Sequence, residues 1–333
     1  MNQQFMEGIS TMPGAVADQA RGRVIIPFPA EGGKPPGRLM TFLLSSGFLL
    51  HDIDIRSTVI PDFSMFGERK GKMLKINYCS RGRCELKLYN GEYTYLSGGE
   101  VAIEIGKAME SYYYPAAEYE GIELIMMMSG NWRDEIRIAG SVLTAPDVLA
   151  RRCEDEERLQ IASAGAFLPR IAREIHEYAT EDADRRLIFA KALEILFLLE
   201  KMPLNKAKVK RNYYTTSQVE IAKAVKRLIT KDLTVRYTAK TLAKQFGISE
   251  TSLKNYFRGV YGCGYAEYQT ELRMKLAAKL LSESHDRVVK IANAVGYASQ
   301  TKFGIAFKSF YGTAPLEYRR AAALQQISIR EEK

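Results

Sequence analysis

The sequence predicts an α+β chain in which a β-rich N-terminal domain is followed by helices and then by an all-α domain with two helix-turn-helix motifs. Three observations predict it. Residues 40–128 have the pattern of short strands separated by turns, the apolar period becomes helical after Pro146, and one helix-turn-helix pattern occurs twice, at about 239–261 and 288–311. The 333 residues suffice for two or three domains of about 100–200 residues each.

The predicted segments follow changes in composition along the chain. Residues 1–37 hold five of the eleven prolines and are expected to form a flexible arm, because such a composition buries little apolar surface. After the arm we expect a β-rich domain at 38–145, a helical dimerisation region at 146–203, a basic linker at 204–216, an all-α domain at 217–322 and a charged tail at 323–333.

Composition and charge exclude several classes of protein. With 46% hydrophobic and 26% charged residues, the chain is expected to be globular. It has no apolar run near the roughly 20 residues of a membrane span, no secretory signal at its start, and only four cysteines. We therefore expect a cytoplasmic protein without membrane contact.

Positive charge is concentrated in the C-terminal third. Lys and Arg outnumber Asp and Glu by 24 to 10 from residue 206 onward, but number 24 against 29 before it. This distribution favours a polyanionic partner for the C-terminal part. A basic surface that is simply solvated is the alternative.

Short strands are expected across residues 40–128. Segments 73–80 and 84–89 are separated by Arg81-Gly82, and Asn90-Gly91 is typical of a two-residue hairpin turn in which both positions need φ > 0. Many short strands with frequent turns favour a barrel or a sandwich.

Helical spacing begins after Pro146. Apolar residues from Leu159 to Ile175 recur at roughly helical intervals, and 185–202 is predicted to be a helix with more apolar surface than one buried stripe requires. The surplus indicates dimerisation through this region, with packing on the β-rich domain as the alternative. Ser217 and Glu220 fit a capping box for a helix that ends near Thr230.

The first helix-turn-helix motif has its caps and turn in the expected places. Thr238 is predicted to cap a helix over 239–246, Gly247 to end it in a left-handed conformation, and Ser249 to cap the second helix. Side chains that can hydrogen-bond bases or phosphates then lie at the start and outward side of the second helix. They are Ser249, Glu250, Thr251, Ser252, Lys254, Asn255 and Arg258.

The same pattern returns about 50 residues later. A helix over 288–295, a turn at Gly296-Tyr297 and a helix capped by Ser299 follow in the same order. The outward side of this second helix comprises Ser299, Gln300, Thr301, Lys302, Gly304, Ile305 and Lys308. A helix over 265–281 separates the motifs and spans roughly 25 Å. Such a spacer can hold two helices about one duplex turn, roughly 34 Å, apart, so double-stranded DNA is the expected partner.

Residues 217–320 resemble the AraC/XylS family of bacterial transcription regulators. The resemblance rests on the spacing of Tyr268, Arg273, Met274, Ala277, Leu280, Leu281, Ile291-Ala292, Val295-Gly296-Tyr297, Phe303, Phe307-Lys308, Tyr311-Gly312, Pro315 and Tyr318-Arg319. It implies a DNA-binding transcription regulator rather than an enzyme, with RNA polymerase as a plausible further partner.

Family base-reading positions map onto Thr251, Lys254 and Asn255 in the first motif. In the second motif they map onto Gln300, Thr301, Lys302, Gly304 and Ile305. Gly304 and Ile305 depart from the pattern, because many members carry a polar residue and an arginine or lysine there. Either Ile305 touches a thymine methyl group or the second motif mainly grips the DNA backbone.

The N-terminal half is similar, more loosely, to the family's regulatory domain, which is a cupin-like β-barrel followed by dimerisation helices. Residues 95–101 look like the barrel turn that usually contains Pro-Gly-Asp. The resemblance implies a homodimer and allows a small-molecule effector in the barrel. The candidate effector-binding residues are Tyr78, Tyr112, Tyr114, Glu123 and Met126.

No metal, cofactor or catalytic residue is expected. His51, His176 and His285 are too far apart in sequence for the histidine set of enzymatic cupins. Cys79 and Cys84 are interpreted as small buried residues rather than as a redox pair. Two alternatives stay open: a regulator controlled by a protein partner without a small ligand, and a cupin-type enzyme fused to a DNA-binding module.

Overall fold

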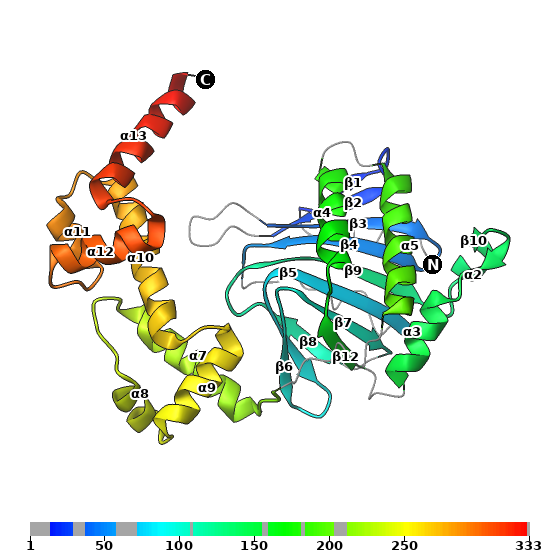
Figure 1. Ribbon diagram of the computed structural model, residues 1–333, viewed down its shortest axis with the longest axis horizontal. Coiled ribbons are helices and arrows are strands. Elements are labelled where there is room, and N and C mark those ends of the chain that lie inside the picture. Colours follow the sequence, from blue (N-terminus) through cyan, green and yellow to red (C-terminus); the bar gives the residue numbers. More distant parts are fainter. Residues whose placement is uncertain are drawn as a thin grey trace. The chain divides into compact units, whose positions relative to one another are not determined.

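The computed structural model describes residues 14–28, 37–57, 72–106, 109–154, 159–180, 184–202 and 212–331. The chain divides into two compact units, Met1–Thr215 and Thr216–Lys333, and each is described by itself (Figure 1). Within the described ranges, no helix is both long enough and apolar enough to span a bilayer.

The N-terminal unit is built on one ten-stranded sheet. In spatial order its strands are β1 (Val16–Asp18), β2 (Arg23–Pro27), β3 (Arg38–Ser45), β4 (Phe48–Ile55), β9 (Tyr119–Met127), β5 (Met73–Leu88), β7 (Glu100–Ile105) and β12 (Leu159–Ser163), while β6 (Tyr93–Ser97) and β8 (Met109–Tyr113) both pair with β5. A separate ribbon pairs β10 (Arg137–Ile138) with β11 (Ser141–Val142). The described strands do not close into a ring, so a sheet-rich region is confirmed and a cupin-like barrel is not.

The predicted break at Arg81-Gly82 is wrong, because β5 runs through it as a single strand of 16 residues. The register shifts between Cys79 and Arg81 in a β-bulge. Gly82 has φ +89°, and a Cβ there would lie 2.2 Å from the Glu118 carbonyl oxygen. The predicted hairpin at Asn90-Gly91 does connect β5 to β6, and Gly91 has φ +83°.

The predicted flexible arm is also wrong in part, because β1 and β2 lie inside residues 1–37 and β2 pairs with β3. Val24, Ile26 and Phe28 are at most 2% exposed. Their alternation with outward residues is a strand pattern, and this apolar burial outweighs the proline-rich composition around it. Four of the five prolines, Pro13, Pro29, Pro35 and Pro36, lie outside the described residues.

Three helices cover one face of the sheet: α3 (Ala145–Glu154), α4 (Phe167–Thr180) and α5 (Arg185–Lys201). Figure 1 shows α4 and α5 lying across the strands, and the short α2 (Trp132–Glu135) follows β9. The predicted helix over 185–202 is confirmed. Between α3 and α4, however, the predicted helical spacing is wrong, since 159–163 forms β12. Ile161 and Ala162 are buried on opposite faces of that strand, and a short run buried on both faces has no diagnostic period.

Charged contacts fix α4 and α5. Lys191 of α5 pairs with Glu174 of α4 at 2.5 Å and with Glu194 of its own helix at 2.9 Å. His176 of α4 lies 3.1 Å from Asp52 of β4. That hydrogen bond raises the pKa of His176.

The C-terminal unit is all helical: α7 (Thr216–Lys231), α8 (Ala239–Phe246), α9 (Glu250–Tyr261), α10 (Tyr265–Glu283), α11 (Val288–Ala294), α12 (Gln300–Tyr311) and α13 (Pro315–Glu331). The predicted helices of both motifs and the spacer between them are confirmed. Helix α7 begins at Thr216, so Ser217 lies inside its first turn, and α13 continues through most of the predicted tail. Helix α10 packs against α7 and α9 and also against α11, α12 and α13.

Candidate nucleic-acid interface

The first motif is shaped by hydrogen bonds that its sequence predicts. The Thr238 hydroxyl accepts from the Thr241 backbone N–H at 3.1 Å, and the Thr241 hydroxyl in turn accepts from the Thr238 backbone N–H. Gly247 ends α8 with φ +65°. The Ser249 hydroxyl then caps α9 by accepting from the Ser252 backbone N–H at 3.0 Å. These local contacts set the angle at which α9 leaves the turn.

The second motif repeats this arrangement. Ser299 caps α12 by accepting from the Lys302 backbone N–H at 3.4 Å. The turn closes on a Tyr297 N–H to Ala292 carbonyl bond of 2.9 Å, and the bond from Ile248 to Ala243 in the first motif measures 3.0 Å. The two motifs are therefore one supersecondary unit used twice.

The repeat extends into the aromatic packing behind each second helix. The rings are Phe257, Tyr261 and Tyr268 in the first copy and Phe307, Tyr311 and Tyr318 in the second. The centroids of Phe257 and Tyr261 are 4.6 Å apart, and those of Phe307 and Tyr311 are 4.7 Å apart. Gly262 and Gly312 end the two helices with φ +80° and +77°. Positions fifty residues apart in α9 and α12 are thus structurally equivalent.

Most of the predicted DNA-binding residues lie exposed on α9 and α12. Ser252 and Ser299 are half-buried at the helix starts. The exposed members are Ser249, Glu250, Thr251, Lys254, Asn255, Arg258, Gln300, Thr301, Lys302, Ile305 and Lys308. Leu253 and Phe257 of α9, and Phe303 and Phe307 of α12, turn inward and are at most 1% exposed. Each second helix thus buries an apolar side and leaves a polar side outward.

A buried arginine joins the loop before the first motif to the turn of the second. Arg273 of α10 is 9% exposed. It donates from Nε to the Leu233 carbonyl at 2.7 Å and from Nη2 to the Val235 carbonyl at 3.1 Å. Its guanidinium also lies 5.9 Å from the ring centroid of Tyr297, in the turn of the second motif. Burial lowers the pKa of Arg273.

Gly296 brings that same turn against the same loop. It has φ +82°, and a Cβ added there would lie 2.6 Å from the Leu233 carbonyl oxygen. The loop between α7 and α8 therefore contacts the turn between α11 and α12. We call Arg273, Gly296 and the carbonyls of Leu233 and Val235 the seam. The resemblance included Arg273 and Gly296 without giving either a role, because their partners are distant in sequence.

The predicted effector-binding residues are not brought together. Tyr78 and Met126 lie in the core beneath the helices, whereas Tyr114 lies in a second core on the other face of the sheet. Glu123 is near Tyr114, and Tyr112 belongs to β8, with its side chain outside the described set. Burial raises the pKa of Tyr114 well above its usual value, with the nearby Cys84 and Glu123 adding to the shift.

A row of polar side chains crosses the sheet on the face away from α4 and α5. Thr41, His51, Glu123 and Asn77 stand opposite one another on neighbouring strands. The Thr41 hydroxyl lies 2.8 Å from His51 Nδ1, and Thr41, His51 and Asn77 are 0%, 7% and 6% exposed. We call these four residues the polar row. Of the four, the sequence predicts Glu123 alone, because β3 and β4 are buried on both faces and have no alternation that would mark Thr41 or His51.

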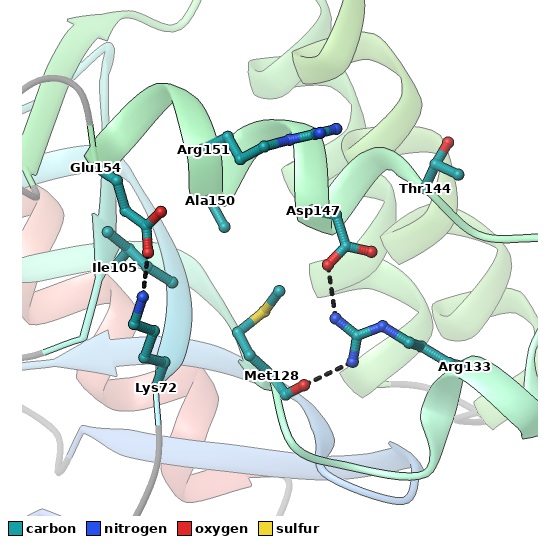
Figure 2. Close-up of a pocket in the computed structure, with 9 residues that line it drawn as sticks. All are labelled: Lys72, Ile105, Met128, Arg133, Thr144, Asp147, Ala150, Arg151 and Glu154. Atoms are coloured by element: carbon teal, nitrogen blue, oxygen red, sulfur yellow. Dashed lines mark hydrogen bonds and ion pairs between the residues drawn. The ribbon is translucent and has the colours of Figure 1, made fainter.

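A cleft of about 530 Å³ lies between α3 and the end of the sheet. Figure 2 shows that its charged side chains largely pair with one another: Lys72 with Glu154, and Arg133 with Asp147 at 2.6 Å. Arg133 also donates to the Met128 carbonyl. These contacts attach α3 to the sheet, which is a structural role.

Neither metal-binding nor thiol chemistry marks a site in the described part of the chain. No three His, Cys, Asp or Glu side chains gather there as metal ligands. Burial raises the pKa of Cys79 to about 12, and that of Cys84 well above its usual value. Both thiols therefore stay protonated and buried.

Comparison with known proteins places the C-terminal motifs in a family. Residues 242–321 match the model of a helix-turn-helix domain family. A putative AraC-like transcription regulator of Streptomyces lividans is 36% identical over 84 residues, which are 25% of this chain and 28% of that protein. The RCS-specific HTH-type transcriptional activator RclR of Escherichia coli K12 is 39% identical over 83 residues, 25% of this chain and 29% of that protein. The aligned part is thus under a third of either relative.

A longer but weaker similarity reaches into the N-terminal unit. The HTH-type transcriptional regulator GadX of Escherichia coli O127:H6 is 24% identical over 250 residues, 73% of this chain and 85% of that protein. Together with the repeated motif, these matches establish that the C-terminal region carries an AraC-type helix-turn-helix domain.

The seam predicts unequal responses at two turn glycines. Gly247→Ala should cost about 1–2 kcal/mol, the penalty of a left-handed backbone, because a Cβ there meets open space. Gly296→Ala should cost clearly more, because its Cβ would also meet the Leu233 carbonyl. Denaturant unfolding of both variants measures the difference. Equal losses of stability would contradict the close approach at Gly296.

Proposed function

We propose that this protein is a sequence-specific DNA-binding transcription regulator. The observation that carries the proposal is the repeat itself: two equivalent helices, α9 and α12, expose polar side chains from one unit whose halves share the seam. That unit contains 20 Lys and Arg against 10 Asp and Glu from residue 216 onward. A basic surface of this kind supplies the electrostatic part of DNA affinity.

In this proposal α9 and α12 enter successive segments of one major groove. The exposed Thr251, Lys254 and Asn255 of α9 and Gln300 and Thr301 of α12 contact base edges. Arg258 and Lys308, at equivalent positions one turn further along, contact phosphates. Because α10 contacts both motifs, their spacing is set before DNA binds, which reduces the entropy lost on binding.

The interface predicts that two substitutions in α12 behave differently. Lys308→Ala should weaken binding to all sequences and reduce the magnitude of the log–log salt slope by about 0.9, because one phosphate contact is lost. Gln300→Ala should relax preference at one base pair, typically by about 1–3 kcal/mol.

Fluorescence anisotropy on selected and random duplexes, at several salt concentrations, measures both effects. Lys279→Ala, an exposed residue of α10 rather than of α9 or α12, is the control. An equal loss by both α12 variants on selected and random DNA would contradict the assignment, and absence of sequence preference in the unmodified chain would contradict the proposed function.

We further propose that the N-terminal unit forms a homodimer through α5. Ile188, Ile195 and Leu196 of this helix are fully buried against the sheet, yet Leu187 and Phe197 are 46% and 38% exposed. Apolar side chains on the outward side of an already packed helix are typical of an interface with another chain.

Phe197→Glu should shift the protein from dimer to monomer, because a charged side chain in an apolar interface loses its hydration without gaining a partner. Sedimentation velocity at micromolar concentration measures this. Val142→Glu is the matched control, since Val142 is 41% exposed in the same unit but lies on β11. A single-chain mass for the unmodified protein would contradict dimerisation.

For control by a small molecule we propose the polar row as the binding site. A buried hydroxyl, imidazole and amide, together with a half-buried carboxylate, on one sheet face suit a small polar ligand. The linker returns to the sheet at β6: Tyr93 and Tyr214 exchange backbone hydrogen bonds of 2.8 and 2.9 Å, and the Tyr214 ring lies 5.9 Å from that of Tyr95. A change in the sheet can therefore act on the chain segment that leads into α7.

Thermal-shift screening with small polar metabolites tests this site. A true effector at about 100 times its dissociation constant should stabilise the protein by roughly 2.7 kcal/mol. His51→Gln should lose that shift, because it changes the polar row. His176→Gln should keep it, because His176 contacts the opposite face through Asp52. If both variants responded as the unmodified chain does, the polar row would not be the site.

A further inference from the structure

One position of α12 is occupied by a residue that the fold does not require. Gly304 lies in the interior of a 12-residue helix and is half-buried. A Cβ added there would meet nothing within 4 Å, and its φ is not in the left-handed region. Glycine is among the least favourable residues in a helix interior. Neither packing nor backbone geometry therefore explains it.

The equivalent position of the first motif is filled differently. The residue of α9 equivalent to Gly304, fifty positions earlier, is Lys254, which is exposed. At the next equivalent position, α9 has Asn255 and α12 has Ile305. Because the caps and the aromatic rings behind both helices correspond, these pairs occupy the same places on the two surfaces. The first helix thus carries hydrogen-bonding side chains where the second has bare backbone and an alkyl group.

Ile305 is also a residue that folding does not explain. It is 68% exposed on the outward side of α12. Gln300 and Lys308, both exposed, lie one helical turn before and after Gly304. The surface of α12 therefore has two long polar side chains, one on each side of a position without a side chain, and an isoleucine next to that position.

We propose that α12 specifies a thymine by close approach of its backbone at Gly304, which places the Ile305 side chain against the thymine C5-methyl group in the major groove. Glycine is suited to close backbone approach, and the thymine methyl is the one apolar group of the major-groove edges. The first helix, by contrast, recognises its bases through Lys254 and Asn255. This inference rests on the proposed function and concerns how the second half of the site is read.

Gly304→Ala tests the close approach, because it should move stability and affinity in opposite directions. In the full chain, the variant should melt a few °C higher, since alanine favours the helix. On a duplex selected by the unmodified protein from a random library, its affinity should fall about tenfold. Lys279→Ala, on α10, is the control and should leave the affinity unchanged.

Removal of a single methyl group tests the thymine contact. Each thymine of the selected duplex is replaced in turn by deoxyuridine. One replacement, in the half of the site bound by α12, should weaken binding of the unmodified protein to the duplex about fourfold, as expected for one buried methyl group. Ile305→Ala should bind the thymine and deoxyuridine duplexes equally.

The outcomes separate this inference from the proposed function. If the library yields no preferred sequence, the proposed function fails and the inference fails with it. If a sequence is selected but Gly304→Ala retains full affinity, or no deoxyuridine replacement matters, the inference alone is overturned and α12 grips the DNA backbone. A lower melting temperature for Gly304→Ala also overturns it, because the fold would then require the glycine.

Discussion

The arrangement of the C-terminal unit depends on the buried guanidinium of Arg273. Its hydrogen bonds to the Leu233 and Val235 carbonyls satisfy groups of a loop that belongs to neither motif helix. Loss of this side chain would remove the donor to the Leu233 carbonyl, whereas the Val235 carbonyl would keep its bond from Gln269 Nε2 at 2.9 Å. The loop as well as the contact with the second motif would therefore be disturbed. Gly296 sits against the same loop from the second motif. The two halves are therefore joined by polar contacts that tolerate little displacement, in addition to the long helix α10.

The two copies of the motif agree where they pack and differ where they are exposed. Serine caps, left-handed glycines and the three aromatic rings are shared between them. Those residues determine how each second helix is held. The outward positions differ, with Lys254 and Asn255 in one copy and the half-buried Gly304 and exposed Ile305 in the other. Since substitutions of exposed residues usually change stability little, folding does not constrain these positions, and their side chains can be suited to binding instead.

The helical unit could be predicted closely from the sequence because its signals are local. Thr238, Gly247 and Ser249 act on backbone groups within a few residues, and the structure has each of them in its predicted role. The N-terminal unit was less predictable because strand pairing is non-local. Nothing near residues 159–163 indicates that β7 will pair with them. The seam could not be predicted either, because its groups are distant in sequence and come together only in the folded chain.

The linker contact has a strength suited to control. The bridge between Tyr93 and Tyr214 has two backbone hydrogen bonds, each worth about 0.5–1.5 kcal/mol net. The ring contact of Tyr214 with Tyr95 and a 3.5 Å bond from the Thr94 hydroxyl to the Asn212 carbonyl add to it. A coupling between distant sites is typically about 1–3 kcal/mol, which is the order of energy that the proposed ligand would supply to open or close this contact. A longer strand pairing would cost more free energy to open than such a coupling supplies. A linker without any pairing would not be coupled to the sheet. A single bridge, placed two residues before α7 begins, lies between these limits.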